Sequence, residues 1–509
     1  MTLIENRTFG AGWTRFLLLA ASTALLALSG MAQAALNGVS GPNFALSAEE
    51  GYISVSDGGS IYSWGYTNSG TMQLPGPTLI VTQGETVTVE LANNLPVAAG
   101  NVSIVFPGHE VTATGGVEGD LVREAQTGST VTYTFTADQP GTYQYHSGTQ
   151  PDLQVEMGLY GALIVRPANH ADTTDCTSPV IATGGKAYNH ADACYDREYL
   201  YLLSEIDIDI HQAAEAQVNG PGPIVLPAGA YHSEYWLMNG RAGPDSMAAD
   251  GTDVLPYQPY GSLTRMHPGE RLLVRVVGAG REMHPFHTHG NHVRLLARDG
   301  RMLLTPTNAL AGPLLFTIPT LPGGTADGIF QWTGKDLGWD MYEAYSTVFD
   351  AAAPGGERPH NCVDAVNNTT GDPSPDGFAD ADSDYPWEWC GDHDQPIPVT
   401  LPSLSSLAFG GFYSGSPFLG ALGSLPPGEG GLNPWAGFAY MWHSHTEREL
   451  VNNDVFPGGL MSMLIVEARG VPIDLGAGEE HWIPSSQNQA LRTPPGSIVK
   501  AAFPIALVS

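Results

Sequence analysis

The stretch VTQGETVTVELANN (residues 81–94) has a Gly-Glu turn followed by alternating apolar and polar side chains. Successive side chains of a β-strand point to opposite faces, so this pattern predicts strands with one buried face. With the preceding TLIV it predicts two half-buried strands joined near Gly84. The segments STVTYTFTADQPGTYQYHSG (129–148) and GLYGALIVRP (158–167) continue the pattern. We therefore expect an antiparallel β-sandwich here.

The same pattern occurs a second time along the chain. MHPGERLLVRVVGAG (266–280) repeats the Gly-Glu turn and the alternating strand. WHSHTERELVNNDVFPGGLMSMLIVEA (442–468) repeats YHSGTQPDLQVEMGLYGALIVRP (145–167), with a histidine-bearing strand end before an apolar closing strand. This internal duplication predicts an all-β fold with two tandem Greek-key β-sandwiches of one type.

A long segment interrupts the second copy. PGGTADGIFQWTG (322–334) predicts one more strand, and a region rich in Gly, Pro and Asp then precedes the second histidine motif. A structureless loop of that length is improbable in a compact domain, so we interpret the segment as an insertion with its own turns. The expected organisation is a signal peptide (1–34), a first domain (36–168), a linker (169–200), a second domain (201–335 and 431–470) interrupted by the insertion (336–430), and a C-terminal tail (471–509).

The N-terminus and the charge limit the cellular setting. Arg7 and Arg15 precede the apolar run FLLLAASTALLAL, and AQA at 32–34 is a small-residue cleavage site, which predicts a secreted or periplasmic protein. An uncleaved anchor is disfavoured because the run is shorter than the ~20 residues of a membrane span, and we expect no span after processing. The chain of 509 residues has a formal charge of −32, which excludes nucleic acid as a partner.

The four cysteines are Cys176, Cys194, Cys362 and Cys390. An even number in an exported chain predicts disulfides, and among three connectivities we favour the pairs nearest in sequence, 176–194 and 362–390. No cysteine lies in a CxxC pair or beside a histidine pair, so a thiolate metal site is not expected.

Closely spaced histidines predict a metal site. HPFHTHGNH (284–292) and WHSH (442–445) each contain an H-x-H pair, and residues two apart on a strand share a face. Paired imidazoles suit copper or zinc. The isolated histidines, which more often serve as hydrogen-bonded core or surface residues, are His170, His190, His211, His232, His360, His393 and His481.

These motifs resemble those of the multicopper oxidases. HPFHTHG, WHSHTE and GGLMSMLIVEA are similar to the family's copper motifs, and residues 45–168 and 255–467 carry the likeness. The resemblance implies cupredoxin-like domains, copper as the cofactor, O₂ as the oxidant and a small-molecule or metal-ion electron donor. In the family, a type 1 copper held by two histidines and a cysteine takes electrons from the donor, and a histidine-bound cluster reduces O₂.

The resemblance also implies that the type 1 site is largely lost. Ser444 stands at the position of the copper-binding cysteine, Glu449 at the second type 1 histidine, and Asp454 at the axial methionine. His284 matches the remaining type 1 ligand. A serine hydroxyl is not a soft ligand, so we expect no blue copper.

The ligands of the oxygen-reducing cluster are retained in part. By resemblance, His287 corresponds to a type 2 ligand, and His146, His289, His443 and His445 correspond to type 3 ligands. Gly148 replaces the partner of His146, and His109 in VFPGHEV is the remaining histidine of the first-domain motif.

Three interpretations follow from this ligand set: a divergent copper oxidoreductase with a type 2 or type 3-like site, a non-catalytic copper-sequestering protein, or a structural protein. The intact histidine pairs disfavour the third interpretation. By analogy with two-domain relatives, the chain would form a homo-oligomer, a trimer, in which domains of neighbouring subunits meet.

Overall fold

The computed structural model describes residues 36–178, 180–181, 184–335, 338, 340, 347–349, 352, 354, 357–368, 370–385, 388–395, 438–466 and 473. The expected signal peptide and nearly all of the expected tail lie outside these residues, as does much of the expected insertion. Among the described residues, helices are short and none has the length and apolar character that a membrane span requires.

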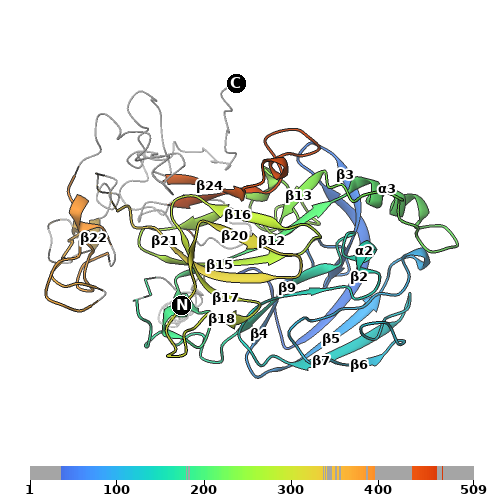
Figure 1. Ribbon diagram of the computed structural model, residues 1–509, viewed down its shortest axis with the longest axis horizontal. Helices are drawn as coiled ribbons and strands as arrows, with labels where there is room; N and C mark the ends of the chain where they lie inside the picture. The colour runs from blue at the N-terminus through green and yellow to red at the C-terminus, as the bar shows by residue number, and fades with distance from the viewer. Residues whose placement is uncertain are drawn as a thin grey trace, which may run out of the picture. The chain divides into compact units, whose positions relative to one another are not determined.

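The first domain is a sandwich of a five-stranded and a four-stranded sheet (Figure 1). The five-stranded sheet has the order β3 (Ser60–Thr67), β2 (Asn43–Ser54), β5 (Thr86–Asn93), β7 (Thr130–Thr136) and β6 (Thr112–Gly115). The four-stranded sheet has the order β1 (Val39–Ser40), β4 (Leu79–Thr82), β9 (Tyr160–Arg166) and β8 (Gly141–His146). The strands that the alternating pattern predicts are therefore confirmed, and their inward side chains form one core.

The second domain repeats this plan with a seven-stranded and a five-stranded sheet. The larger sheet contains β13 (Tyr235–Met238), β12 (Arg197–Ile206), β15 (Arg271–Gly278), β21 (Thr325–Gln331), β17 (Val293–Arg298) and β18 (Arg301–Met302), with β19 (Leu314–Leu315) paired to β17. The smaller sheet has the order β14 (Thr264–Met266), β25 (Met461–Val466), β24 (Phe438–Ser444), β16 (His284–Thr288) and β20 (Thr317–Thr320). The chain thus folds as tandem cupredoxin-like sandwiches. Strand β12 begins at Arg197, a few residues before the expected start of this domain.

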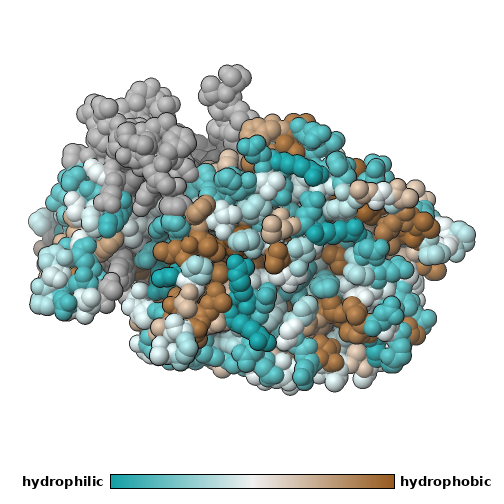
Figure 2. All heavy atoms as spheres, in the orientation of Figure 1, coloured by the Kyte–Doolittle hydropathy of each residue, from teal (hydrophilic) through white to brown (hydrophobic). Residues whose placement is uncertain are grey.

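The shorter elements connect these sheets. They are α2 (Pro151–Gln154), β10 (Gly185–Lys186), β11 (Cys194–Tyr195), α3 (Ile208–Gln217), β22 (Thr347–Phe349) and β23 (Glu357–Pro359), and the 3-10 turns η1 (Val97–Ala99), η2 (Ala191–Ala193), η3 (Asp245–Met247), η5 (Cys390–Asp392) and η6 (Glu447–Leu450). Both expected disulfides are confirmed, Cys176 to Cys194 and Cys362 to Cys390. Figure 2 shows hydrophilic residues over much of the visible face, with apolar side chains interspersed.

The Gly-Glu turns explain why the two halves of the sequence look alike. Gly84 and Gly269 both have positive φ, which a residue with a side chain rarely adopts. In each turn the glutamate that follows folds back onto the chain: Glu85 accepts a hydrogen bond from the Thr82 amide at 2.7 Å, and Glu270 accepts one from the His267 amide at 2.7 Å. The same capped turn therefore carries the chain from one sheet to the other in both domains.

Strand pairing is duplicated as well. In the first domain β2 pairs in parallel with β5, and β4 with β9. In the second domain β12 pairs in parallel with β15, and β14 with β25. The expectation of a purely antiparallel sandwich is therefore wrong, because each sheet of the two sandwiches contains a parallel pair, but the internal repeat that the sequence predicts is confirmed at the level of topology.

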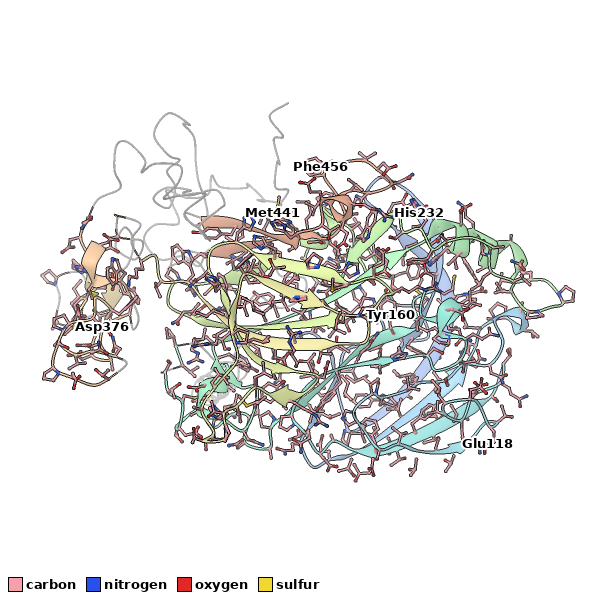
Figure 3. All side chains as sticks on the ribbon, in the orientation of Figure 1. Glu118, Tyr160, His232, Asp376, Met441 and Phe456 are labelled. Carbon is pink, nitrogen blue, oxygen red and sulfur yellow. A yellow bond between two sulfur atoms is a disulfide. The ribbon has the colours of Figure 1, made fainter. Side chains whose placement is uncertain are left out.

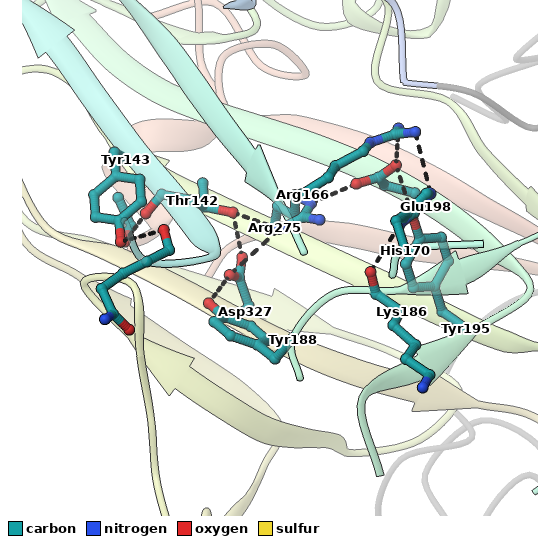
Figure 4. A network of polar contacts seen from close by, with 12 residues as sticks. Thr142, Tyr143, Arg166, His170, Lys186, Tyr188, Tyr195, Glu198, Arg275 and Asp327 are labelled. Carbon is teal, nitrogen blue, oxygen red and sulfur yellow. Dashed lines mark hydrogen bonds and ion pairs between the residues drawn. The ribbon is translucent and has the colours of Figure 1, made fainter. Parts of the chain in front are cut away.

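A buried polar network joins the two domains (Figure 4). Arg275 is fully buried; its Nε contacts Glu198 at 2.6 Å and its Nη1 donates to Thr142 at 2.8 Å. Arg166 of the first domain contacts the other oxygen of Glu198 at 2.8 Å. Burial alone would raise the pKa of Glu198, but the two arginines lower it. Because a buried charge without its partner is costly, this network favours one arrangement of the domains.

Candidate metal centre

Four histidine rings come together where β16 and β24 lie side by side. The two strands are antiparallel, and His287 lies directly opposite His443. The pairing continues beyond β16, where the His289 amide donates to the carbonyl of Met441, labelled in Figure 3. Because alternate residues of a strand share a face, His287 and His289 project on the same side as His443 and His445. The tertiary pairing therefore unites the two H-x-H motifs.

The ring distances show a compact cluster. The His287 ring lies 4.7 Å from the His289 ring, 4.7 Å from the His445 ring and 5.4 Å from the His443 ring, measured between centroids. The Nε2 atoms of His289 and His443 are 3.2 Å apart. One ring nitrogen from each of His287, His289 and His443 lies within 4.8 Å of the others. This spacing brings three imidazole ligands within reach of one ion.

The outer ring nitrogens are held by hydrogen bonds. His443 Nδ1 donates to the carbonyl oxygen of Ser444 at 2.5 Å, which leaves the Nε2 lone pair directed into the cluster. His287 Nδ1 lies 2.9 Å from Thr317 Oγ1. Such bonds set the tautomer and the ring orientation of metal-binding histidines. His287, His289 and His443 thus fit copper by ligand type and by convergence, and the outer nitrogens of His287 and His443 are already hydrogen-bonded.

The cluster favours neutral imidazoles. Burial, together with the neighbouring histidines, lowers the pKa of His287 to about 4. Burial also lowers the pKa of His443. Neutral imidazole is the form that binds metal, so these rings are available as ligands at neutral pH.

His146 lies in the first domain, at the end of β8, and adopts the same posture as His443. Its Nδ1 lies 2.9 Å from the carbonyl oxygen of the next residue, Ser147, as His443 Nδ1 does from Ser444. Ser147 and Ser444 each accept a hydrogen bond at 3.1 Å from the amide two residues further on. His146 nevertheless does not join the group of nitrogens formed by the second-domain histidines.

His109 also lies apart from this group. Its ring packs against Phe135 at 4.8 Å and Tyr143 at 4.6 Å, and burial lowers its pKa. The structure therefore gives it aromatic contacts within the first domain.

His284 faces the opposite side of β16 and lies between two carboxylates. Its Nδ1 is 2.9 Å from Glu449 Oε2, and its Nε2 is 2.9 Å from Glu205 Oε2. The ring is fully buried. Burial alone would lower the pKa of His284, but the two carboxylates raise it to about 9, so the ring is a buried imidazolium. In this arrangement neither ring nitrogen is open to a metal.

A glycine makes room for this ion triad. A Cβ atom on Gly280 would lie 1.9 Å from Glu205 Oε2, so the carboxylate occupies space that a larger residue would fill. Glu205 also accepts a hydrogen bond from the Glu282 amide at 2.9 Å. The sequence did not indicate Glu205, because its strand lies far from the histidine motifs along the chain; the Gly-Ala-Gly ending of the 266–280 stretch is the one local sign of close packing.

The other positions that depart from the family's copper motifs are two at the type 1 site besides Glu449 and one beside His146. Ser444 is buried, and its hydroxyl accepts the Thr446 amide ahead of η6. Asp454 is exposed in a turn with positive φ. Gly148 leaves no space for a histidine, since a Cβ there would lie 2.7 Å from Val105 Cγ1. These residues offer no blue-copper ligand set.

Comparisons with known proteins match parts of this chain to copper oxidases. The multicopper oxidase family model matches residues 53–170. A laccase of Aspergillus fumigatus is 30% identical over 167 residues, which is 30% of this chain and 28% of the relative. An L-ascorbate oxidase of Brassica rapa subsp. pekinensis is 36% identical over 98 residues, which is 18% of this chain and 16% of the relative.

A solved structure, the blue copper oxidase from Nitrosomonas europaea, is 17% identical with a TM-score of 0.44, covering 83% of this chain and 85% of that one. The chain spans less than a third of the length of the curated relatives named above. Fold and site define a cupredoxin-like protein with a cluster of converging histidines that could hold a metal ion. Over residues 53–170 the chain is similar to the multicopper oxidases, whose cofactor is copper.

Proposed function

We propose that this chain is an exported copper-dependent oxidoreductase whose copper is held by His287, His289, His443 and His445, and which has no type 1 copper. The observation that carries the proposal is the convergence of neutral imidazoles across the β16–β24 pair, with the outer nitrogens of His287 and His443 already hydrogen-bonded. Bound copper would supply one-electron redox chemistry towards O₂.

The residues on the other face of β16 and β24 limit where an electron donor can deliver its electrons. A buried imidazolium between Glu205 and Glu449 repels a cation, and the Ser444 hydroxyl is engaged with the backbone. An electron donor must therefore approach the histidine cluster itself. His445 is exposed and His287 and His289 are partly exposed, so a small organic molecule or a metal ion can reach the rings.

We further propose that His146 completes the centre in a homo-oligomer, as a trimer. Its posture matches that of His443, yet it lies outside the second-domain cluster within one chain. A closed ring of subunits would place the first domain of one copy against the second domain of the next. A monomer at micromolar concentration in analytical ultracentrifugation would contradict this part of the proposal.

Subunit complementation tests the shared site. A His146→Ala variant and a His443→Ala variant should each lose part of the copper when purified alone. Co-refolded mixtures should regain copper and O₂ consumption, because some interfaces then pair two intact faces. If the copper content and O₂ consumption of the mixtures equal the average of the two variants, the ligands come from one chain.

Copper stoichiometry and spectra test the centre as a whole. Copper-loaded protein should show the electron paramagnetic resonance of imidazole-bound Cu(II) without the intense blue band of a copper thiolate. O₂ consumption with phenolic, amine and metal-ion donors then separates an enzyme from a copper-sequestering protein. Bound copper with no turnover of any donor would favour sequestration, and absence of copper would contradict both.

A further inference from the structure

A second group of metal-ligating side chains lies in the insertion, apart from the copper motifs. Ligand atoms of Asp340, His360, Glu388 and His393 all lie within 4.8 Å of one another. The first three residues are buried and the fourth is partly buried. His360 and His393, which sequence spacing leaves as isolated histidines, have ring centroids only 4.9 Å apart. Residues from three separate parts of the insertion thus meet at one point.

Two atoms of this group are buried without a hydrogen-bond partner among the described residues. They are Glu388 Oε2 and His393 Nε2. The Glu388 side chain is fully buried, and its other oxygen lies 2.8 Å from His360 Nε2. A buried carboxylate oxygen left unpaired costs free energy. A cation between Glu388 and His393 would satisfy both orphan atoms.

The surrounding contacts orient the group inwards. His393 Nδ1 lies 3.2 Å from Asp394 Oδ2, so a carboxylate lies beside the outer nitrogen, while Nε2 is buried. One oxygen of Asp340 accepts the Asp394 amide at 3.0 Å. A histidine whose outer nitrogen bonds a carboxylate is the common arrangement behind metal ligands.

The donor set selects the class of ion. Two imidazoles and two carboxylates suit Zn²⁺, which prefers four nitrogen, oxygen or sulfur ligands in a tetrahedron. Ligands about 2.0–2.1 Å from zinc lie roughly 3.3 Å from one another, so the observed spread requires only a small closure. Calcium prefers oxygen ligands throughout, and the described cysteines are all in disulfides, which removes the soft ligands that Cu(I) prefers.

The position of the group indicates a structural role. Cys362 and Cys390 form a disulfide, and each lies two residues from a member of the group, His360 and Glu388 respectively. A buried site with four protein ligands has no open position for substrate, which is typical of structural zinc. Two carboxylates in one buried place also repel each other, and a divalent cation removes that repulsion.

The acidic stretch DPSPDGFADADSD (372–384) of the same insertion forms no second group of this kind among the described residues. Asp364 accepts the amides of Asp376 and Gly377 at 3.0 Å each, and Asp380 accepts the Ala365 amide at 2.6 Å. These carboxylates cap the loop backbone, and they are not among the groups of ligand atoms that converge in the described residues. Figure 3 labels Asp376 in this loop.

We propose that Asp340, His360, Glu388 and His393 bind one divalent cation, Zn²⁺ by the chemistry of the ligands, and that this ion stabilises the fold of the insertion. The site is separate from the copper centre, so each can fail without the other.

Metal analysis of the full-length protein tests this proposal. Protein whose histidine cluster is first filled with copper, then incubated with Zn²⁺ and dialysed, should retain one tightly bound zinc per chain, and Co²⁺ in place of zinc should give the visible bands of a tetrahedral site. The Glu388→Gln variant should lose this metal, and Asp394→Asn should weaken its binding ~10–100-fold. His232→Ala, which removes an exposed histidine paired with Glu234, should change neither value.

The copper ligands provide the second control. The His287→Ala/His443→Ala variant should lose copper and keep the zinc-type ion. Limited proteolysis of wild-type protein should cut the insertion faster after chelation, a result that needs no variant. Wild-type protein that retains no zinc or Co²⁺ beyond the copper centre, or a Glu388→Gln variant that keeps its full metal, would overturn the proposal.

Discussion

The two faces of β16 and β24 carry histidines in opposite chemical states. On one face His287 lies among other imidazoles, and burial lowers its pKa to about 4. On the other face His284 lies between Glu205 and Glu449, and its pKa is raised to about 9. The two residues are three positions apart on the same strand. Residue type therefore does not identify a metal ligand; the partners that tertiary structure brings to each face decide it.

The largest effect should come from breaking the imidazole face. The His289→Ala/His443→Ala variant removes two converging ligands, and we expect copper binding to be lost entirely. Metal analysis by mass spectrometry measures this. His232→Ala serves as a matched control, because it removes an exposed histidine that lies outside the cluster. Full copper content in the double variant would place the copper elsewhere.

Changes on the face that carries His284, Glu205 and Glu449 should lower the stability of the protein and leave copper binding intact. His284→Leu leaves two buried carboxylates facing each other without the imidazolium, and we expect the free energy of unfolding to fall by ~3–5 kcal/mol. Denaturant unfolding measures the loss. Adding Glu449→Gln to the same variant should recover part of it, since one of the two charges is then removed. A copper loss equal to that of the cluster variant would show that His284 is a ligand.

The same face should make stability depend on pH. The folded-state pKa of His284, about 9, lies above the ordinary value of 6.5, so its contribution is fully present below about pH 6.5 and is lost as pH rises through about 9. The shift corresponds to a contribution on the order of 3 kcal/mol. The stability difference between wild type and His284→Leu should therefore shrink over this range. A difference that stays constant would exclude the imidazolium.

The smallest expected effect is that of Ser444→Cys. Restoring the thiol alone should produce no blue absorption, because Glu449 stands where a second histidine is needed and His284 is held by carboxylates. The double variant Ser444→Cys/Glu449→His also supplies the missing imidazole, and we expect it to show a blue band. An intense blue band in the single variant would show that copper displaces the Glu205 and Glu449 contacts of His284.

Much of the fold could be predicted because its signs are local. Alternation at a period of two specifies which side chains are buried, and the Gly84 and Gly269 turns recur with the same capping glutamates. The spacing of the H-x-H pairs likewise placed His443 and His445 on one face. That His287 and His443 lie close together could be expected only from the family resemblance. The register between two strands that are far apart in the chain cannot be read from the sequence of either strand.

The remaining features depend on contacts between segments that are far apart in the chain. Glu205 reaches His284 because Gly280 leaves space for it, and His360 meets His393 because the insertion folds back on itself. The sequence by itself determined the sandwiches and the face of each paired histidine, because short-range periodicity and spacing control those, and it favoured the disulfide pairs that the structure contains. Only the tertiary structure decided which histidine is charged and which are neutral, because protonation follows from partners that folding brings within 3 Å of His284.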